Sequence, residues 1–143
     1  MKAVLLSIIA LIFTVTTVFA DNGINAASST MPNYVESFIL QHFNNVNVAD
    51  FEYDDDDFEV RLSNGIKIEF SHKGQWEEIK GHGNAIPLSV LPSLVAATIN
   101  KNHPQATMIK VEREWNGYKI KLNSGIKLFI DGNGTLLGQK QDR

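Results

Sequence analysis

The most conspicuous chemical feature of the sequence is a run of four carboxylates, Asp54, Asp55, Asp56 and Asp57. Such a run could coordinate Ca²⁺, which prefers oxygen ligands, or it could enter a basic cleft on a partner protein. It could also form a solvated hairpin turn. Sixty residues later the chain reads Glu114-Trp115-Asn116-Gly117, a turn sequence without a carboxylate excess, which favours the turn. We therefore predict no metal here and keep a partner-binding loop as an alternative.

Other residues with catalytic or ligating chemistry are too scattered to define a site. The histidines show no metal-ligand spacing, although zinc needs three or four converging ligands; they are His42, His72, His82 and His103. The sequence has no cysteine, no serine in a G-x-S-x-G elbow and no Gly-rich phosphate loop. Asp131-Gly132-Asn133-Gly134 begins like a calcium loop but lacks the later acidic ligand. We therefore predict no enzyme activity, no metal and no cofactor.

An internal repeat sets the architecture that must position these residues. Residues 31–76 reappear without a gap as residues 91–136, so that Met31-Pro32 aligns with Leu91-Pro92 and Gly65 with Gly125. A constant offset indicates one supersecondary unit used twice. Units of this size bury too little surface to be stable alone. We therefore expect one compact domain over 31–143, made of repeat 1 (31–80), a connector (81–90) and repeat 2 (91–139).

Each repeat is predicted to be one helix followed by four strands. Pro32 and Pro92 open the helices, whose apolar stripes are Val35, Phe38, Ile39, His42 and Phe43, and then Leu94, Val95, Thr98 and Ile99. The predicted strands are 46–54, 58–63, 66–70 and 75–80, and then 107–115, 118–123, 126–130 and 135–139. Apolar and polar residues alternate, which indicates an antiparallel sheet with helices on one face and water on the other. The fold class is thus α+β, two tandem α-β-β-β-β repeats joined by a connector that Gly81 and Gly83 make mobile.

The uncovered sheet face is the better candidate for a binding surface. Alternation places on it Glu52, Asp54, Glu59, Arg61, Lys67 and Glu69 of repeat 1, and Glu112, Glu114, Lys119, Lys121, Lys127 and Phe129 of repeat 2. Phe129 stands out among these charges, and Trp115 is a second large aromatic at a predicted hairpin tip. Aromatics beside basic residues often anchor protein interfaces. Mixed charges also occur on any solvated face, and Phe129 would be plain core if its strand were buried on both sides.

The N-terminus is predicted to be a signal peptide over residues 1–20. Lys2 supplies a positive start, residues 4–18 are mostly apolar, and Val18-Phe19-Ala20 offers a cleavage site. A retained anchor is the competing interpretation, but the apolar run is shorter than the roughly 20 residues that span a bilayer. Residues 21–30 are predicted to be a flexible spacer, and no later segment is predicted to span a membrane. Without Lys2 the chain has 12 basic and 16 acidic residues, which argues against a nucleic-acid partner.

Each repeat has a leading proline and helix, and repeat 1 continues with Asn64-Gly65-Ile66-Lys67-Ile68-Glu69-Phe70 and then Gly74 and Trp76. This spacing resembles the PepSY-like, beta-lactamase-inhibitor-like proteins that Gram-negative gut and oral bacteria export. The resemblance covers nearly all of the chain after the signal peptide. The chain departs from the pattern at Ser71, where an Asp is frequent, and at Leu136, which replaces the Trp of repeat 1. The resemblance implies no established enzyme activity, and the inhibitor-like label rests on fold similarity.

These observations together predict an exported, non-catalytic binding protein, periplasmic or secreted, with another exported protein or a peptide as its partner. Inhibition of an envelope enzyme is the sharpest form of this hypothesis. The candidate binding residues are Asp54, Asp55, Asp56, Asp57, Trp115, Lys119, Lys121, Lys127 and Phe129. The alternative is a small-ligand-sensing or envelope-stress module that holds an apolar molecule between helices and sheet, for which a sizeable apolar cavity would be the mark.

Overall fold

A computed structural model describes residues 31–55 and 57–142 of the chain. The predicted signal peptide and spacer lie outside the described residues, as does Asp56. The elements follow in the order α1 (Asn33–His42), β1 (Val48–Asp54), β2 (Asp57–Leu62), β3 (Lys67–Phe70), β4 (Trp76–Lys80), η2 (Leu88–Val90), α2 (Ser93–Asn102), β5 (Met108–Glu114), β6 (Gly117–Leu122), β7 (Ile126–Asp131) and β8 (Leu136–Gln141). The predicted fold class is confirmed: one helix and four strands occur twice.

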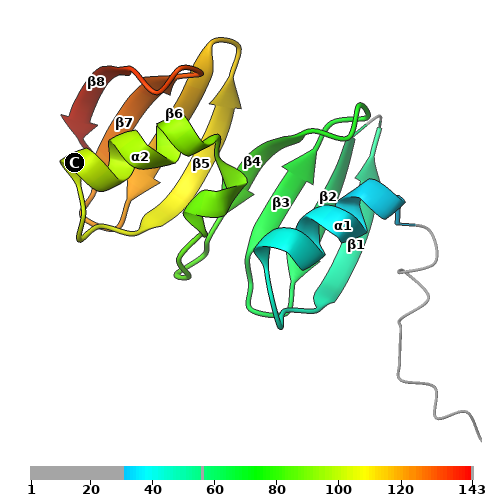
Figure 1. The fold of residues 1–143 in the computed structure, drawn as a ribbon. Helices are drawn as coiled ribbons and strands as arrows, with labels where there is room; N and C mark the ends of the chain where they lie inside the picture. Colours follow the sequence, from blue (N-terminus) through cyan, green and yellow to red (C-terminus); the bar gives the residue numbers. More distant parts are fainter. Residues whose placement is uncertain (1–30, 56, 143) are drawn as a thin grey trace, which may run out of the picture.

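The eight strands form one antiparallel sheet in which spatial order equals chain order. Figure 1 shows both helices on the same side of this sheet, with α1 across β1 to β3 and α2 across β5 to β7. Strands β4 and β5 join the repeats through the pairs Glu78–Glu112, Ile79–Val111 and Lys80–Lys110. The helix-free side of the sheet is called the open face below. No helix in the described part of the chain is long and apolar enough to cross a membrane.

One cluster of buried apolar side chains runs through both repeats. It continues from strand to strand through Val60, Ile68, Ile79, Val111, Ile120 and Leu128, each fully buried. From the helices, Val35 and Ile39 of α1 and Val95 and Ile99 of α2 complete the cluster. Since Ile79 pairs with Val111 across the boundary between the repeats, the apolar interior is continuous there.

Leu94 is a correction to the predicted helix stripe. Its side chain is 60% exposed, whereas the neighbouring Val95 is fully buried. The reason is its position over the turn between β7 and β8. Gly134 lies there at φ +85°, and a Cβ on Gly134 would stand 2.6 Å from the Leu94 carbonyl oxygen. The Leu94 backbone therefore lies against the β7–β8 turn, while its side chain is exposed.

Irregular register recurs at equivalent places in the two repeats. The register of pairing shifts between Val48 and Asp50 in β1, and it shifts between Met108 and Lys110 at the equivalent place in β5. A second equivalent set of shifts occurs where β3 pairs with β4 and where β7 pairs with β8. Such bulges insert an extra residue and interrupt simple alternation. Trp76 and Ile79 are consequently both buried although they are three residues apart. The strand ends differ from the predicted ones by up to two residues.

The connector, which was predicted to be mobile, pairs with β5 at two points. The Gly81 N–H donates to the Ile109 carbonyl oxygen at 2.9 Å, and Ile86 bridges Met108. A Cβ on Gly81 would stand 2.1 Å from the Asn84 carbonyl oxygen. Gly81 thus permits the close approach of the Asn84 backbone. The connector ends in η2, which precedes α2 and buries Val90.

Candidate functional site

Cross-strand pairing arranges the open face into two parallel rows. From β1 to β8 the first row is Glu52, Glu59, Glu69, Glu78, Glu112, Lys119, Phe129 and Gly138. The second row is Asp50, Arg61, Lys67, Lys80, Lys110, Lys121, Lys127 and Lys140. Neighbouring strands lie about 4.8 Å apart, so each row is a line of side chains at that spacing.

In repeat 1 the cations of the second row are paired with carboxylates of the first row. The Lys67 Nζ lies 2.6 Å from Glu59 Oε2, and the Lys80 Nζ lies 3.3 Å from Glu69 Oε1 and also contacts Glu78. The hydrogen bond that Lys80 donates to Glu78 outweighs burial and raises the pKa of Lys80. Exposed ion pairs of this kind contribute about 0–1 kcal/mol each. This half of the open face is an ordinary solvated surface.

Repeat 2 has exchanged most of these carboxylates for other residues. Asp50, Glu59, Glu69 and Glu78 correspond, sixty residues later, to Lys110, Lys119, Phe129 and Gly138. Across the eight row positions, repeat 1 therefore carries five carboxylates and three cations, and repeat 2 one carboxylate and five lysines. The charge of the open face changes sign between the two copies.

Four lysines and a glutamate line a depression of about 120 Å³ on the repeat 2 half of the open face. They are Lys110, Glu112, Lys119, Lys121 and Lys127, called the lysine pocket below. The Glu112 carboxylate lies between two amines, 2.7 Å from Lys110 Nζ and 2.5 Å from Lys119 Nζ. Burial alone raises the pKa of Glu112, but hydrogen bonds from Lys110 and Lys119 outweigh it and lower the pKa to about 2. Lys121 and Lys127 are paired with Asp142 instead.

Glu112→Gln is expected to lower the free energy of unfolding by about 1 kcal/mol at pH 7, because two adjacent amines lose their shared carboxylate. The folded-state pKa lies below the ordinary 4.5, so this stabilisation is present above pH 4.5 and is lost as the pH falls toward 2. Urea unfolding of both proteins at pH 7 and near pH 2.5 measures the change. Glu77→Gln, at an exposed position of β4, is the control. An equal difference at both pH values would contradict the ion-pair origin.

Phe129 is half-buried and lies on the open face, outside the buried core. It stands opposite Lys119 on β6 and Gly138 on β8. The Lys140 Nζ lies 5.8 Å from the centroid of its ring, within the range of a cation–π contact. Because Gly138 has no side chain, the β8 side of the ring is left uncovered by its cross-strand neighbour.

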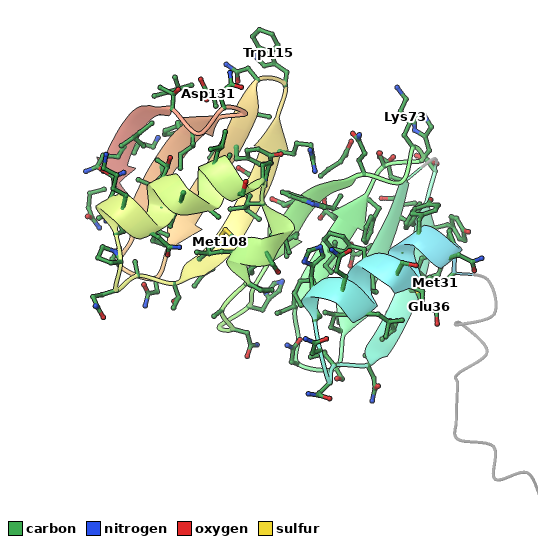
Figure 2. The ribbon with its side chains drawn as sticks, viewed as in Figure 1. Met31, Glu36, Lys73, Met108, Trp115 and Asp131 are labelled. Atoms are coloured by element: carbon green, nitrogen blue, oxygen red, sulfur yellow. The ribbon has the colours of Figure 1, made fainter. Side chains whose placement is uncertain are left out.

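Trp115 projects from the tip of the β5–β6 hairpin, as Figure 2 shows. It follows the last pair of that hairpin, Glu114 with Gly117, and its side chain is 95% exposed. Phe129 pairs with Lys119, further along the same hairpin. No ring contact joins Trp115 to Phe129 within the described residues, so the two aromatics are separate points on the surface.

The described aspartates of the acidic run are exposed at the turn between β1 and β2. Asp54 pairs with Asp57, and Asp55 has φ 53°, a left-handed conformation that aspartate tolerates. The Asp57 Oδ1 accepts a hydrogen bond from the His72 N–H at 3.2 Å. Residues 31–55 and 57–142 hold no group of three or more acidic or histidine side chains placed to bind a metal. This turn lies in repeat 1, whereas the lysine pocket lies in repeat 2.

Three residues of this surface were missed by sequence reasoning. Lys110 lies next to the bulge in β5, Lys140 lies beyond the predicted end of the last strand, and Asp142 follows β8. The repeat itself held a usable signal for Lys140, because Lys80 is its counterpart sixty residues earlier. No comparable pattern pointed to Asp142.

Comparison with known proteins extends over both repeats. A family model described as "Putative beta-lactamase-inhibitor-like, PepSY-like" matches residues 21–68 and 56–138. The solved structure of a "putative calcium-regulated periplasmic protein" from Bacteroides thetaiotaomicron is 32% identical, with a TM-score of 0.70, over 79% of this chain and 92% of that one. Two structures of a "putative periplasmic protein" from Bacteroides vulgatus are 29% and 26% identical, with TM-scores of 0.71 and 0.69, over 79% and 82% of this chain and 92% and 97% of theirs. No curated protein is significantly similar to the chain.

Proposed function

The chain belongs to the PepSY-like, beta-lactamase-inhibitor-like family, and from that premise we propose that it is an exported, non-catalytic protein that binds another protein or a peptide. The reversal of charge between the two halves of one open face supports this proposal. An open face that only needed to be solvated could carry the ion-paired rows of repeat 1 in both copies. Repeat 2 instead carries five lysines on the same half of the open face as a half-buried phenyl ring. The binding surface is this half of the open face, together with the hairpin tips.

A sheet face suits recognition of a protein or peptide because its side chains project at fixed spacing from a hydrogen-bonded framework. Phe129 and Trp115 add large apolar groups at two separate points of that framework. Aromatic side chains of this kind carry much of the binding energy at protein interfaces. Trp115, with its indole almost entirely in water, makes few contacts that stabilise the fold, so a role in contacting a partner accounts for it better.

The proposal includes export to the periplasm with removal of residues 1–20. The charged and apolar pattern of this segment supports it. The similar solved structures add support, because the names of all three include the word periplasmic. Inhibition of an envelope enzyme is the sharper form of the proposal, and the family description is its support.

The small-ligand alternative receives less support from the geometry. Pockets for small molecules usually enclose about 300–1,000 Å³ and are mostly apolar. The lysine pocket measures about 120 Å³ and is lined by charged side chains. A depression of that size suits one side chain of a larger partner.

Capture from periplasmic extract tests the proposal. The double variant Trp115→Ala plus Phe129→Ala is expected to lose the proteins that the wild-type chain retains, because each change removes a large contact surface at a candidate anchor. Leu40→Ala is the matched control, since Leu40 is also a large exposed apolar residue, 68% exposed, but lies on α1. Quantitative mass spectrometry of the bound fractions gives the result. If the double variant retains the same proteins as the wild type and the control, the aromatic interface is wrong.

A further inference from the structure

One carboxylate reaches the open face of repeat 2 from outside the two rows. Asp142 follows β8, and its N–H donates to the Gly125 carbonyl oxygen at 2.8 Å. Its Oδ2 lies 2.7 Å from Lys121 Nζ, and its Oδ1 lies 2.9 Å from Lys127 Nζ. Each carboxylate oxygen thus accepts from one lysine, and both lysines belong to the lysine pocket.

This arrangement has no counterpart among the described residues of repeat 1. There, Arg61 and Lys67 take the equivalent positions and are paired with Glu59, a residue of the neighbouring row. Repeat 2 has Lys119 in place of Glu59. Within the described residues, Lys121 and Lys127 have no carboxylate partner besides Asp142. The second copy has therefore lost the built-in partner of these two cations and meets them with a carboxylate from a peptide segment that lies outside the rows.

The contact has the features of a bound anion. Hydrogen bonds from Lys121 and then from Lys127 lower the pKa of Asp142 to about 2, so the group is ionised at neutral pH. A Cβ on Gly125 would stand 2.6 Å from the Gln141 Nε2, and the φ of +83° at Gly125 suits glycine. Asp142 does not belong to the buried apolar cluster, so breaking its contacts with the two lysines removes nothing from the core.

We propose that the lysine pocket binds carboxylates of an acidic peptide segment in a partner protein, and that Asp142 is an internal competitor that occupies part of the site until the partner displaces it. This inference rests on the proposed function and specifies the chemistry of its partner. The four lysines of the second row on β5 to β8 follow one another at strand spacing, about 4.8 Å. They are Lys110, Lys121, Lys127 and Lys140. A line of cations about 14 Å long matches a chain that carries several carboxylates better than it matches a single small anion.

The test measures binding of a fluorescein-labelled hexaglutamate peptide amide by anisotropy at low ionic strength, about 20 mM, where screening is weak. Asp142→Asn is expected to tighten binding by about 3- to 10-fold. The internal carboxylate no longer occupies the site, so a larger fraction of the protein is free to bind the peptide. A chain ending at Gln141 should behave in the same way. Lys121→Gln plus Lys127→Gln is expected to weaken binding by at least about tenfold. The matched control is Arg61→Gln plus Lys67→Gln, which removes the equivalent cations of repeat 1 and should leave binding unchanged.

Several outcomes would overturn the inference. Unchanged or weaker binding by Asp142→Asn and by the shortened chain would remove Asp142 as a competitor. Equal loss in the repeat 1 and repeat 2 double variants would mean non-specific charge attraction. Equal affinity for a hexaglutamine peptide would exclude a peptide carboxylate site. Displacement of the probe by inorganic phosphate, at equal carboxylate and phosphate concentrations, would exclude it as well. Sedimentation that shows self-association abolished by Lys121→Gln plus Lys127→Gln would assign the site to a second copy of this chain.

The experiments distinguish a wrong carboxylate site from a wrong protein-binding proposal. If periplasmic capture still depends on Trp115 and Phe129 while the hexaglutamate probe does not bind, the protein-binding proposal stands and the carboxylate site is wrong. All variants are first compared with the wild type by circular dichroism and thermal melting. The substituted lysines are partly exposed, so native melting is expected in each case.

Discussion

Trp76→Ala is expected to destabilise the protein by about 3–5 kcal/mol, the usual cost of removing a large buried aromatic side chain. Trp76 is 4% exposed and lies on β4, the last strand of repeat 1. Its ring packs against repeat 2, with the Tyr118 ring centroid at 5.9 Å and the Arg113 guanidinium at 4.5 Å. The Arg113 Nε also donates to the Trp76 carbonyl oxygen at 3.0 Å. The substitution therefore removes packing within repeat 1 and across the boundary between the repeats.

Equilibrium unfolding in urea measures this effect, and the chain supplies its own control. Trp115 is the other tryptophan, and it is 95% exposed. Trp115→Ala is expected to change the free energy of unfolding by less than about 0.5 kcal/mol. Similar losses for the two variants would mean that Trp76 does not join the repeats as described. Arg113→Ala should fall between them, since Arg113 adds a cation–π contact of about 0.5–2 kcal/mol.

The boundary between the repeats accounts for the different residues at position 76 and at its counterpart, position 136. Leu136 stands where repeat 1 has Trp76, and it is only half-buried. Strand β4 is followed in the sheet by β5, whose Arg113 covers the tryptophan ring, whereas β8 is the last strand of the sheet order. In the described part of the chain no strand lies beyond β8, so Leu136 has less surface to pack against than Trp76 has.

Much of the fold could be predicted because the repeat and the side-chain period are properties of the sequence alone. The offset of sixty residues defined two equivalent units, and alternation around Phe58, Val60 and Leu62 identified the buried face of β2. The proline at the start of each helix marked its beginning within one residue. The pairing of β4 with β5 continued the sheet through both units, as the marginal size of each unit suggested.

The parts that could not be predicted depend on distance in space. A bulge hid Lys110, because Met108 and Val111 are both buried and the two-residue period fails between them. Alternation assigned Trp115 and Phe129 to wet positions but carried no information on how far apart they lie. Asp142 was missed because it lies beyond the predicted last strand; in the structure it follows β8 beside Gly125, where its carboxylate contacts Lys121.

A chain limited to residues 31–80 is expected to lose cooperative folding altogether. Domains of about 60 residues or fewer bury too small a fraction of their surface to be more than marginally stable. In this fragment Trp76 and Ile79 would lose the Tyr118, Arg113 and Val111 side chains that cover them. Strand β4 would also become an exposed edge, which favours aggregation over a folded monomer.

Circular dichroism and thermal melting of the fragment, beside residues 31–142 as the control, decide the outcome. The longer chain should give one cooperative transition, because its buried residues form a single cluster across both repeats. Mixing residues 31–80 with residues 81–142 should restore part of the helical and strand signal, since the β4–β5 pairing and the Trp76 contacts can form between separate chains. A sharp melting transition for residues 31–80 alone would show that each repeat is an independent domain. The charge reversal between the copies would then divide two autonomous units, and the continuous interior would contribute little to the stability of either.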